Sequence, residues 1–94
     1  MAAAITLKEL KPNFNIIDIR SAIEFQTSHV TGAVSVPYEI LMTYPDSYLK
    51  KGECYYLVCA HGTLSRRACA ILQSYGYNTI SVKDGYDMRC YYYC

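Results

Sequence analysis

The sequence of 94 residues lacks tryptophan and lacks an excess of either charge. Nine Lys and Arg residues against eight Asp and Glu residues give a net charge of +1, so the composition does not favour a nucleic acid partner. Hydrophobic residues make up 52% and charged residues 18%. These values exclude a disordered chain, because such chains combine low hydrophobicity with high net charge. The length indicates one domain, which we assign to residues 1–94.

Long hydrophobic runs are also missing from the sequence. The longest apolar stretches are far shorter than the roughly 20 residues that span a bilayer. The first residues show neither the charged segment nor the long apolar segment of a signal peptide. The number of cysteines is odd, at five, and without a secretion signal this argues against a disulfide scaffold. We therefore expect a cytoplasmic protein that does not bind membranes.

The cysteines and histidines do not have the spacing of a metal site. There is no pair of Cys-x-x-Cys units, and His29 and His61 are far apart in the sequence. Cys90 and Cys94 are four residues apart, which is also the spacing of one helical face, but we interpret them as incidental. We expect neither a metal nor an organic cofactor.

Short strands and short helices are expected to alternate along the chain. Thr6 with Glu9, and Ser21 with Glu24, have the spacing of capping boxes and predict helix starts. The expected strands are 15–19, 33–36, 54–59 and 79–82, and the expected helical pieces are 6–10, 21–27, 38–43, 46–50, one from about 65, and the last nine residues. This alternation favours an α/β fold with a mainly parallel sheet that is covered on both faces.

The helix that begins near Ser65 has the clearest apolar pattern. It is expected to end at Gly76, since glycine is common directly after a helix. Its apolar residues follow the spacing of one helical face; they are Ala68, Ile71, Leu72 and Tyr75.

Cys59 lies where chemistry is expected, because it ends a strand and sites in parallel sheets form at the carboxyl ends of strands. The short loop after it should turn several backbone N–H groups inward, where they and the helix dipole attract negative charge. Gly62 allows the backbone to turn tightly. A thiolate at this position would be stabilised and nucleophilic. The alternative is a buried structural cysteine at the end of a strand.

The register of the loop speaks against a tyrosine phosphatase. Those enzymes place an arginine at the sixth residue after the cysteine, where it grips phosphate with two hydrogen bonds. Here that residue is Ser65, and Arg66 follows one step later. One step rotates a helical residue by about 100°, so the side chain of Arg66 should point away from the loop centre. Arg66, Arg67 and His61 still add positive charge near Cys59.

Three segments in order resemble the rhodanese family, and together they extend over nearly the whole chain. The first is Ile17-Asp18-Ile19-Arg20, which is similar to the family's Asp-x-Arg strand end. The second contains Glu24-Phe25, His29-Val30-Thr31-Gly32-Ala33 and Val36-Pro37. The third contains Cys59-Ala60-His61-Gly62, Ser65-Arg66, Ala68, Leu72 and Gly76-Tyr77. The resemblance implies a three-layer α/β/α domain with a mainly parallel sheet of about five strands.

The resemblance also implies a sulfurtransferase without a cofactor. It would move a sulfane sulfur from thiosulfate or a persulfide donor to a thiol or cyanide through a persulfide on Cys59. The residues expected to bind the substrate follow Cys59; they are Ala60, His61, Gly62, Thr63, Leu64, Ser65 and Arg66. Leu64 cannot form a side-chain hydrogen bond, which argues against thiosulfate itself. Asp84-Gly85 replaces the family's frequent Gly-Gly after the last strand.

Two other functions stay open. The domain could be an interaction or sulfur-carrier module that receives sulfur from a partner protein, or, against the register of Ser65, a phosphatase or arsenate reductase. Asp18 and Arg20 are expected to support the fold by an ion pair or by capping, and His29 to form a structural hydrogen bond. His61 could tune the site or face solvent. Cys69 and Cys54 are expected to be small core residues.

Overall fold

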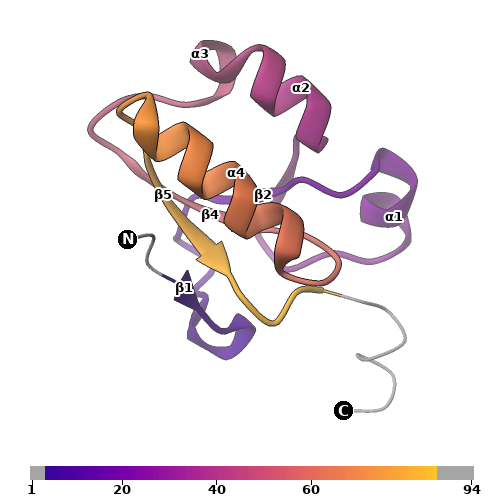
Figure 1. The fold of residues 1–94 in the computed structure, drawn as a ribbon. Coiled ribbons are helices and arrows are strands. Elements are labelled where there is room, and N and C mark those ends of the chain that lie inside the picture. The colour runs from indigo at the N-terminus through magenta and orange to yellow at the C-terminus, as the bar shows by residue number, and fades with distance from the viewer. Residues whose placement is uncertain (1–3, 87–94) are drawn as a thin grey trace.

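The computed structural model describes residues 4–86, in which strands and helices alternate (Figure 1). The strands are β1 Ala4–Ile5, β2 Ile16–Asp18, β3 Val34–Ser35, β4 Cys54–Val58 and β5 Asn78–Val82. The helices are the 3-10 turn η1 Leu7–Glu9, α1 Ala22–Thr27, α2 Tyr38–Thr43, α3 Pro45–Tyr48 and α4 Thr63–Ser74. None of the helices within residues 4–86 is long and apolar enough to cross a membrane.

The five strands form one sheet in the order β1-β5-β4-β2-β3, and every neighbouring pair is parallel. This confirms the expected α/β fold with a parallel sheet. β4 lies at the centre, where Leu57 pairs with Ile17 of β2 and Ser81 of β5. β1 was not predicted, because its two residues are too few to show an alternating pattern. The carboxyl ends of β2, β4 and β5 meet at one edge of the sheet.

The core is divided by the sheet into two clusters. On one face, α2 and α4 cover β4, and the fully buried side chains include Leu41, Leu57 and Leu72 (Figure 1). On the other face, Ile16, Val58 and Val82 pack against η1 and the loops. The sheet is therefore covered on both faces as expected, although the second cover is a 3-10 turn and irregular chain.

The carboxyl end of β2 is held by a buried ion pair. The Arg20 guanidinium donates to both carboxylate oxygens of Asp18, with Nη2 to Oδ2 at 2.8 Å. Burial alone would lower the pKa of Arg20, but the hydrogen bonds and the charge of Asp18 outweigh it and raise this pKa. Arg20 also donates to the backbone carbonyls of Ser28 and Tyr86. The expected structural role of Asp18 and Arg20 is confirmed.

Both predicted capping boxes are present. Ser21 Oγ accepts the Glu24 backbone N–H at 3.2 Å, and Glu24 Oε1 accepts the Ser21 backbone N–H at 3.1 Å. At the other box, Glu9 Oε1 accepts the Thr6 backbone N–H at 2.8 Å, and this bond and the Thr6 hydroxyl lower the pKa of Glu9. The helix that follows Thr6 is shorter than expected, since only Leu7–Glu9 are helical.

Helix α4 differs from the sequence-based expectation in two respects. It begins at Thr63, two residues before Ser65, because Gly62 takes a left-handed conformation with φ of 83° and ends the loop early. Tyr75 was expected on the apolar face but is the residue that caps the end of α4 and is 57% exposed, while the expected burial of Cys69 is confirmed. The final helix expected over the last nine residues falls, from residue 87 on, outside the described residues.

Candidate active site

Cys59 follows the last residue of β4, and its sulfur is held by the loop beyond it. The Sγ atom accepts hydrogen bonds from the backbone N–H groups of Gly62, at 3.0 Å, and Ser65, at 3.2 Å. The residue is only 2% exposed. Both donors lie at the start of α4, where the helix dipole adds to their positive potential. The arrangement directs positive potential at the sulfur and would hold a negatively charged group bound to it.

The buried side chain of Ser65 holds the loop after Cys59 in place. Its side chain is fully buried, and its hydroxyl donates to the carbonyl of Gly62 at 3.2 Å. The same hydroxyl shares a hydrogen bond of 2.8 Å with Ser81 Oγ on β5. Because the Ser65 side chain is satisfied within the fold, only its backbone N–H serves the sulfur.

Two glycines allow the loop to lie directly against the chain that follows β5. A Cβ atom at Gly62 would be 2.1 Å from the Lys83 carbonyl oxygen, and one at Gly85 would be 2.4 Å from the Ala60 carbonyl oxygen. Both glycines have positive φ angles, 83° and 70°. The Tyr86 backbone N–H donates to the Cys59 carbonyl at 2.7 Å, so the loop is anchored to this segment.

A pocket of about 360 Å³ opens above Cys59. Loop, strand and helix residues line it: Ile19, Arg20, Ser21, Glu24, Cys59, Ala60, His61, Thr63, Leu64 and Arg67. A volume of this size is at the low end of the roughly 300–1,000 Å³ of small-molecule sites. A reactant could therefore enter and reach the Cys59 sulfur.

The predicted binding residues take three different positions. Ala60, His61, Thr63 and Leu64 line the pocket. Gly62 and Ser65 are buried beneath it and contribute backbone N–H groups. Arg66 is exposed and is not part of the pocket lining.

Five lining residues were not among the predicted binding residues: Ile19, Arg20, Ser21, Glu24 and Arg67. Four of them follow β2, which is the neighbour of β4 in the sheet. The Asp-x-Arg strand end and the Ser21–Glu24 capping box were visible in the sequence. The order of the strands, which brings them beside Cys59, was not.

The other described cysteines lie in different surroundings. Cys69, on the core side of α4, is fully buried, and this burial raises the pKa of its thiol to about 11. Cys54 is half-buried at the opposite end of β4. Cys54, Cys59 and Cys69 are all free thiols. Among these three, only the sulfur of Cys59 accepts backbone N–H bonds in the described part of the chain.

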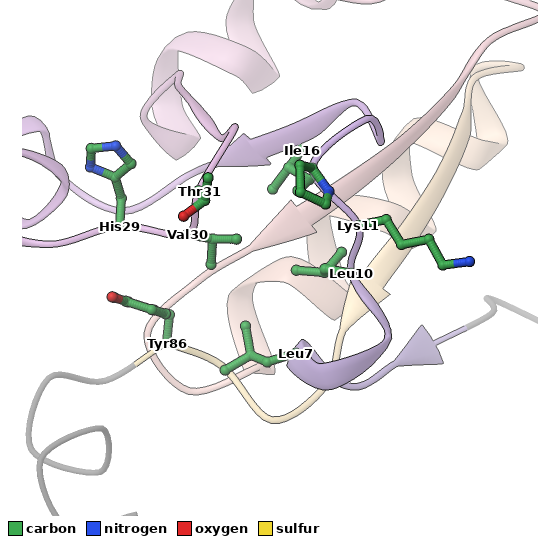
Figure 2. A pocket seen from close by; sticks show the side chains of 9 residues that line it. Leu7, Leu10, Lys11, Ile16, His29, Val30, Thr31 and Tyr86 are labelled. Atoms are coloured by element: carbon green, nitrogen blue, oxygen red, sulfur yellow. The ribbon is translucent and has the colours of Figure 1, made fainter.

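A second pocket, of about 250 Å³, lies over the other face of the sheet (Figure 2). Its labelled side chains come from η1 and the loop after it, from Ile16 on β2, from the segment around Val30, and from Tyr86. His29 lies at its margin, where Nδ1 bonds to the Phe25 carbonyl at 2.7 Å and the two rings stack. This confirms the expected structural role of His29. None of the three described cysteines lines this pocket, and Cys59 lines the pocket described above instead.

Comparisons with known proteins agree with this geometry. A search of the curated proteins found no match. A Staphylococcus saprophyticus protein of known structure is 30% identical, with a TM-score of 0.78 over 92% of this chain and 91% of that one. A rhodanese-like domain protein from Staphylococcus aureus is 28% identical, with a TM-score of 0.76 over 88% of this chain and 86% of that one.

A larger protein is also similar over part of its length. The NAD-dependent persulfide reductase from A. fulgidus is 27% identical, with a TM-score of 0.73, and the match covers 89% of this chain but 15% of the reductase. The family model for the rhodanese-like domain matches residues 3–87. The chain therefore belongs to the rhodanese-like domain family.

Proposed function

We propose that this protein is a sulfurtransferase that carries sulfur as a persulfide on Cys59. The observation that supports it most is the pair of backbone N–H bonds, from Gly62 and Ser65, to a sulfur at the base of an open pocket. These donors are fixed before any reactant arrives, so they stabilise negative charge without rearranging the loop.

The reaction has two steps, and electrons balance in each. The Cys59 thiolate attacks the outer sulfur of a donor, thiosulfate or a persulfide, and the donor's S–S bond breaks. The leaving group is sulfite or a thiolate, and the outer sulfur remains on Cys59. A thiol or cyanide then attacks that sulfur and releases the Cys59 thiolate. This is covalent catalysis with ping-pong kinetics, and the loop amides hold the negative charge of Cys59 before and after transfer.

The setting that we propose for this chemistry is reducing, as in the cytoplasm. Cys54, Cys59 and Cys69 are free thiols, and free thiols persist in reducing compartments. Partners of the same site would be a small sulfur donor and a thiol acceptor.

A sulfur-carrier role is the second candidate. The match to 15% of a protein named as a persulfide reductase favours it, because this chain resembles a segment of a protein that acts on persulfides. In this role Cys59 receives sulfur from a protein partner and reacts slowly with small donors. A phosphatase is disfavoured, since the position of its arginine is occupied by Ser65, which is buried and bonded to Ser81.

Two assays on one preparation test these functions. Transfer of sulfur to cyanide and hydrolysis of an aryl phosphate are measured with the wild type, and Cys59→Ser serves as the blank for both. We expect transfer that depends on Cys59 and no phosphate release. Fast exchange with a protein persulfide but slow transfer from small donors would favour the carrier. Phosphate release without sulfur transfer would contradict the proposal.

A further inference from the structure

The side-chain charges that line the Cys59 pocket do not favour a small dianion over a larger ligand with charges of both signs. Three charged side chains line it, Arg20, Glu24 and Arg67. Arg20 is neutralised by Asp18, which it contacts with three N–H groups, one from its backbone and two from its side chain. The remaining pair, Glu24 and Arg67, carries one charge of each sign. Thiosulfate, with two negative charges, would gain from Arg67 but would be repelled by Glu24.

The carboxylate of Glu24 is held in place at this pocket. Its Oε1 accepts hydrogen bonds from the backbone N–H and the hydroxyl of Ser21, at 3.1 Å and 3.0 Å, and Ser21 also lines the pocket. The capping box therefore gives the negative charge a defined position. A fixed charge discriminates between ligands better than a mobile one, because less side-chain entropy is lost on binding.

The size and the walls of the pocket point to an organic ligand. At about 360 Å³ it is larger than an anion of five heavy atoms requires. Ile19 is almost completely buried and Leu64 is half-buried, and both contribute apolar surface to the lining. Apolar walls with a few placed charges are typical of small organic ligands.

We propose that the preferred donor is the persulfide of a small thiol that carries both an ammonium and a carboxylate, as an amino-acid thiol does. Glu24 faces the ammonium, Arg67 the carboxylate, and Leu64 and Ile19 the carbon chain. This inference rests on the proposed function of Cys59. The Cys59 thiolate attacks the outer sulfur of R–S–SH, a new S–S bond forms, and R–S⁻ leaves. The proton remains on the transferred sulfur, and there is no net oxidation.

The test measures the rate at which Cys59 gains sulfur from three freshly prepared persulfides and from thiosulfate. Cysteine persulfide has both charged groups, cysteamine persulfide lacks the carboxylate, and 3-mercaptopropionate persulfide lacks the ammonium. We expect kcat/KM to be highest for cysteine persulfide.

Two variants test which side chain recognises which charged group of the donor. Glu24→Gln keeps a capping residue, because glutamine also forms this box, and should lower kcat/KM about threefold for the two ammonium donors, as expected for an exposed charge pair. It should not lower the rate for 3-mercaptopropionate persulfide, and it should raise the rate for thiosulfate, because neither donor has an ammonium for Glu24 to face. Arg67→Gln should lower the rate for the two carboxylate donors and for thiosulfate, and spare cysteamine persulfide.

Glu9→Gln is the matched control, since Glu9 has the same capping role at η1 and is absent from the lining of the Cys59 pocket. It should change none of the four rates. The inference is overturned if the three persulfides react equally well, or if Glu24→Gln acts on all donors alike. If no donor places sulfur on Cys59, the proposed function itself fails.

Discussion

Cys59 and Cys69 are ten residues apart in sequence and nearly equally buried, at 2% and 0% exposure, yet their surroundings differ. The sulfur of Cys59 accepts two backbone N–H bonds at the carboxyl edge of the sheet. Cys69 lies among apolar side chains under α4, where burial raises the pKa of its thiol to about 11. We therefore expect the hydrogen bonds to the sulfur and the access from the pocket, rather than burial alone, to decide which of the two thiols reacts.

Replacing each of the two thiols in turn should reveal the largest difference between them, in the rate of sulfur transfer. Cys59→Ser removes the nucleophile and should reduce sulfur transfer by at least about a thousandfold, as loss of a catalytic nucleophile does. The free energy of unfolding should change little, since the two side chains have nearly the same shape. The rate of sulfur transfer to cyanide is the measurement.

Cys69→Ala is the control for that experiment. It leaves the loop intact, so it should retain most of the wild-type transfer. Retention of more than a few per cent of transfer by Cys59→Ser would show that another group is the nucleophile.

The ion pair between Asp18 and Arg20 is buried at the carboxyl edge of the sheet. Asp18→Asn leaves the buried Arg20 without its counterion and should lower the free energy of unfolding by about 3 to 5 kcal/mol. Denaturant unfolding measures this. Glu53→Gln, at an exposed carboxylate, is the control and should change the value by about 0.5 kcal/mol or less. Equal effects of the two substitutions would contradict the role given to the buried pair.

The close approach of the loop to the chain after β5 can be tested with two glycines of similar φ. Gly62→Ala would place a Cβ atom 2.1 Å from the Lys83 carbonyl oxygen, whereas Gly52→Ala meets no atom within 4 Å. Both variants carry the cost of a left-handed alanine, about 1 to 2 kcal/mol. The clash should add about 2 kcal/mol for Gly62→Ala.

The Gly62 substitution should also lower sulfur transfer more than tenfold, because moving the loop displaces the N–H donors by a distance that matters for catalysis. Urea unfolding and transfer assays on both variants measure the difference. Transfer at the wild-type rate in Gly62→Ala would mean that the position of the loop does not control the reaction.

The pH dependence of the free energy of unfolding tests the raised pKa of the buried Cys69 thiol. The thiol pKa is about 11 in the folded state against an ordinary value of 9.0, so the folded protein binds this proton more tightly than the unfolded chain. The stabilisation from Cys69 is fully present below pH 9 and is lost as the pH rises through about 11. The loss amounts to roughly 3 kcal/mol at most.

The measurement is the free energy of unfolding between pH 8 and pH 11, for the wild type and for Cys69→Ala. Titration of the tyrosines and lysines affects both proteins and cancels in the difference. Identical pH profiles would contradict the raised pKa of Cys69.

Patterns among neighbouring residues predicted the helices and strands whose formation depends on those residues alone. The Ser21–Glu24 box predicted the start of α1, and the run from Cys54 predicted β4, because capping and strand propensity depend on neighbouring residues. The start of α4 was predicted two residues late, since Gly62 in its left-handed conformation is already the N-cap of the helix.

The part of the site that depends on the fold could not be predicted from neighbouring residues. Ser65 is polar, so it was missing from the apolar face of α4, yet Ser81 satisfies it within the core. Tyr75 fits the apolar spacing but is exposed at the last turn. Glu24 reaches the pocket only because β2 lies next to β4. Such contacts join residues that are distant in sequence.

The most direct test of the difference between the two buried thiols is to locate the transferred sulfur. The protein is treated with a persulfide donor at neutral pH, and its peptides are analysed by mass spectrometry. An adduct of about 32 Da, the mass of one sulfur atom, is expected on the peptide that contains Cys59 and absent from the peptide that contains Cys69. An adduct on Cys69 with an unmodified Cys59 would contradict the account.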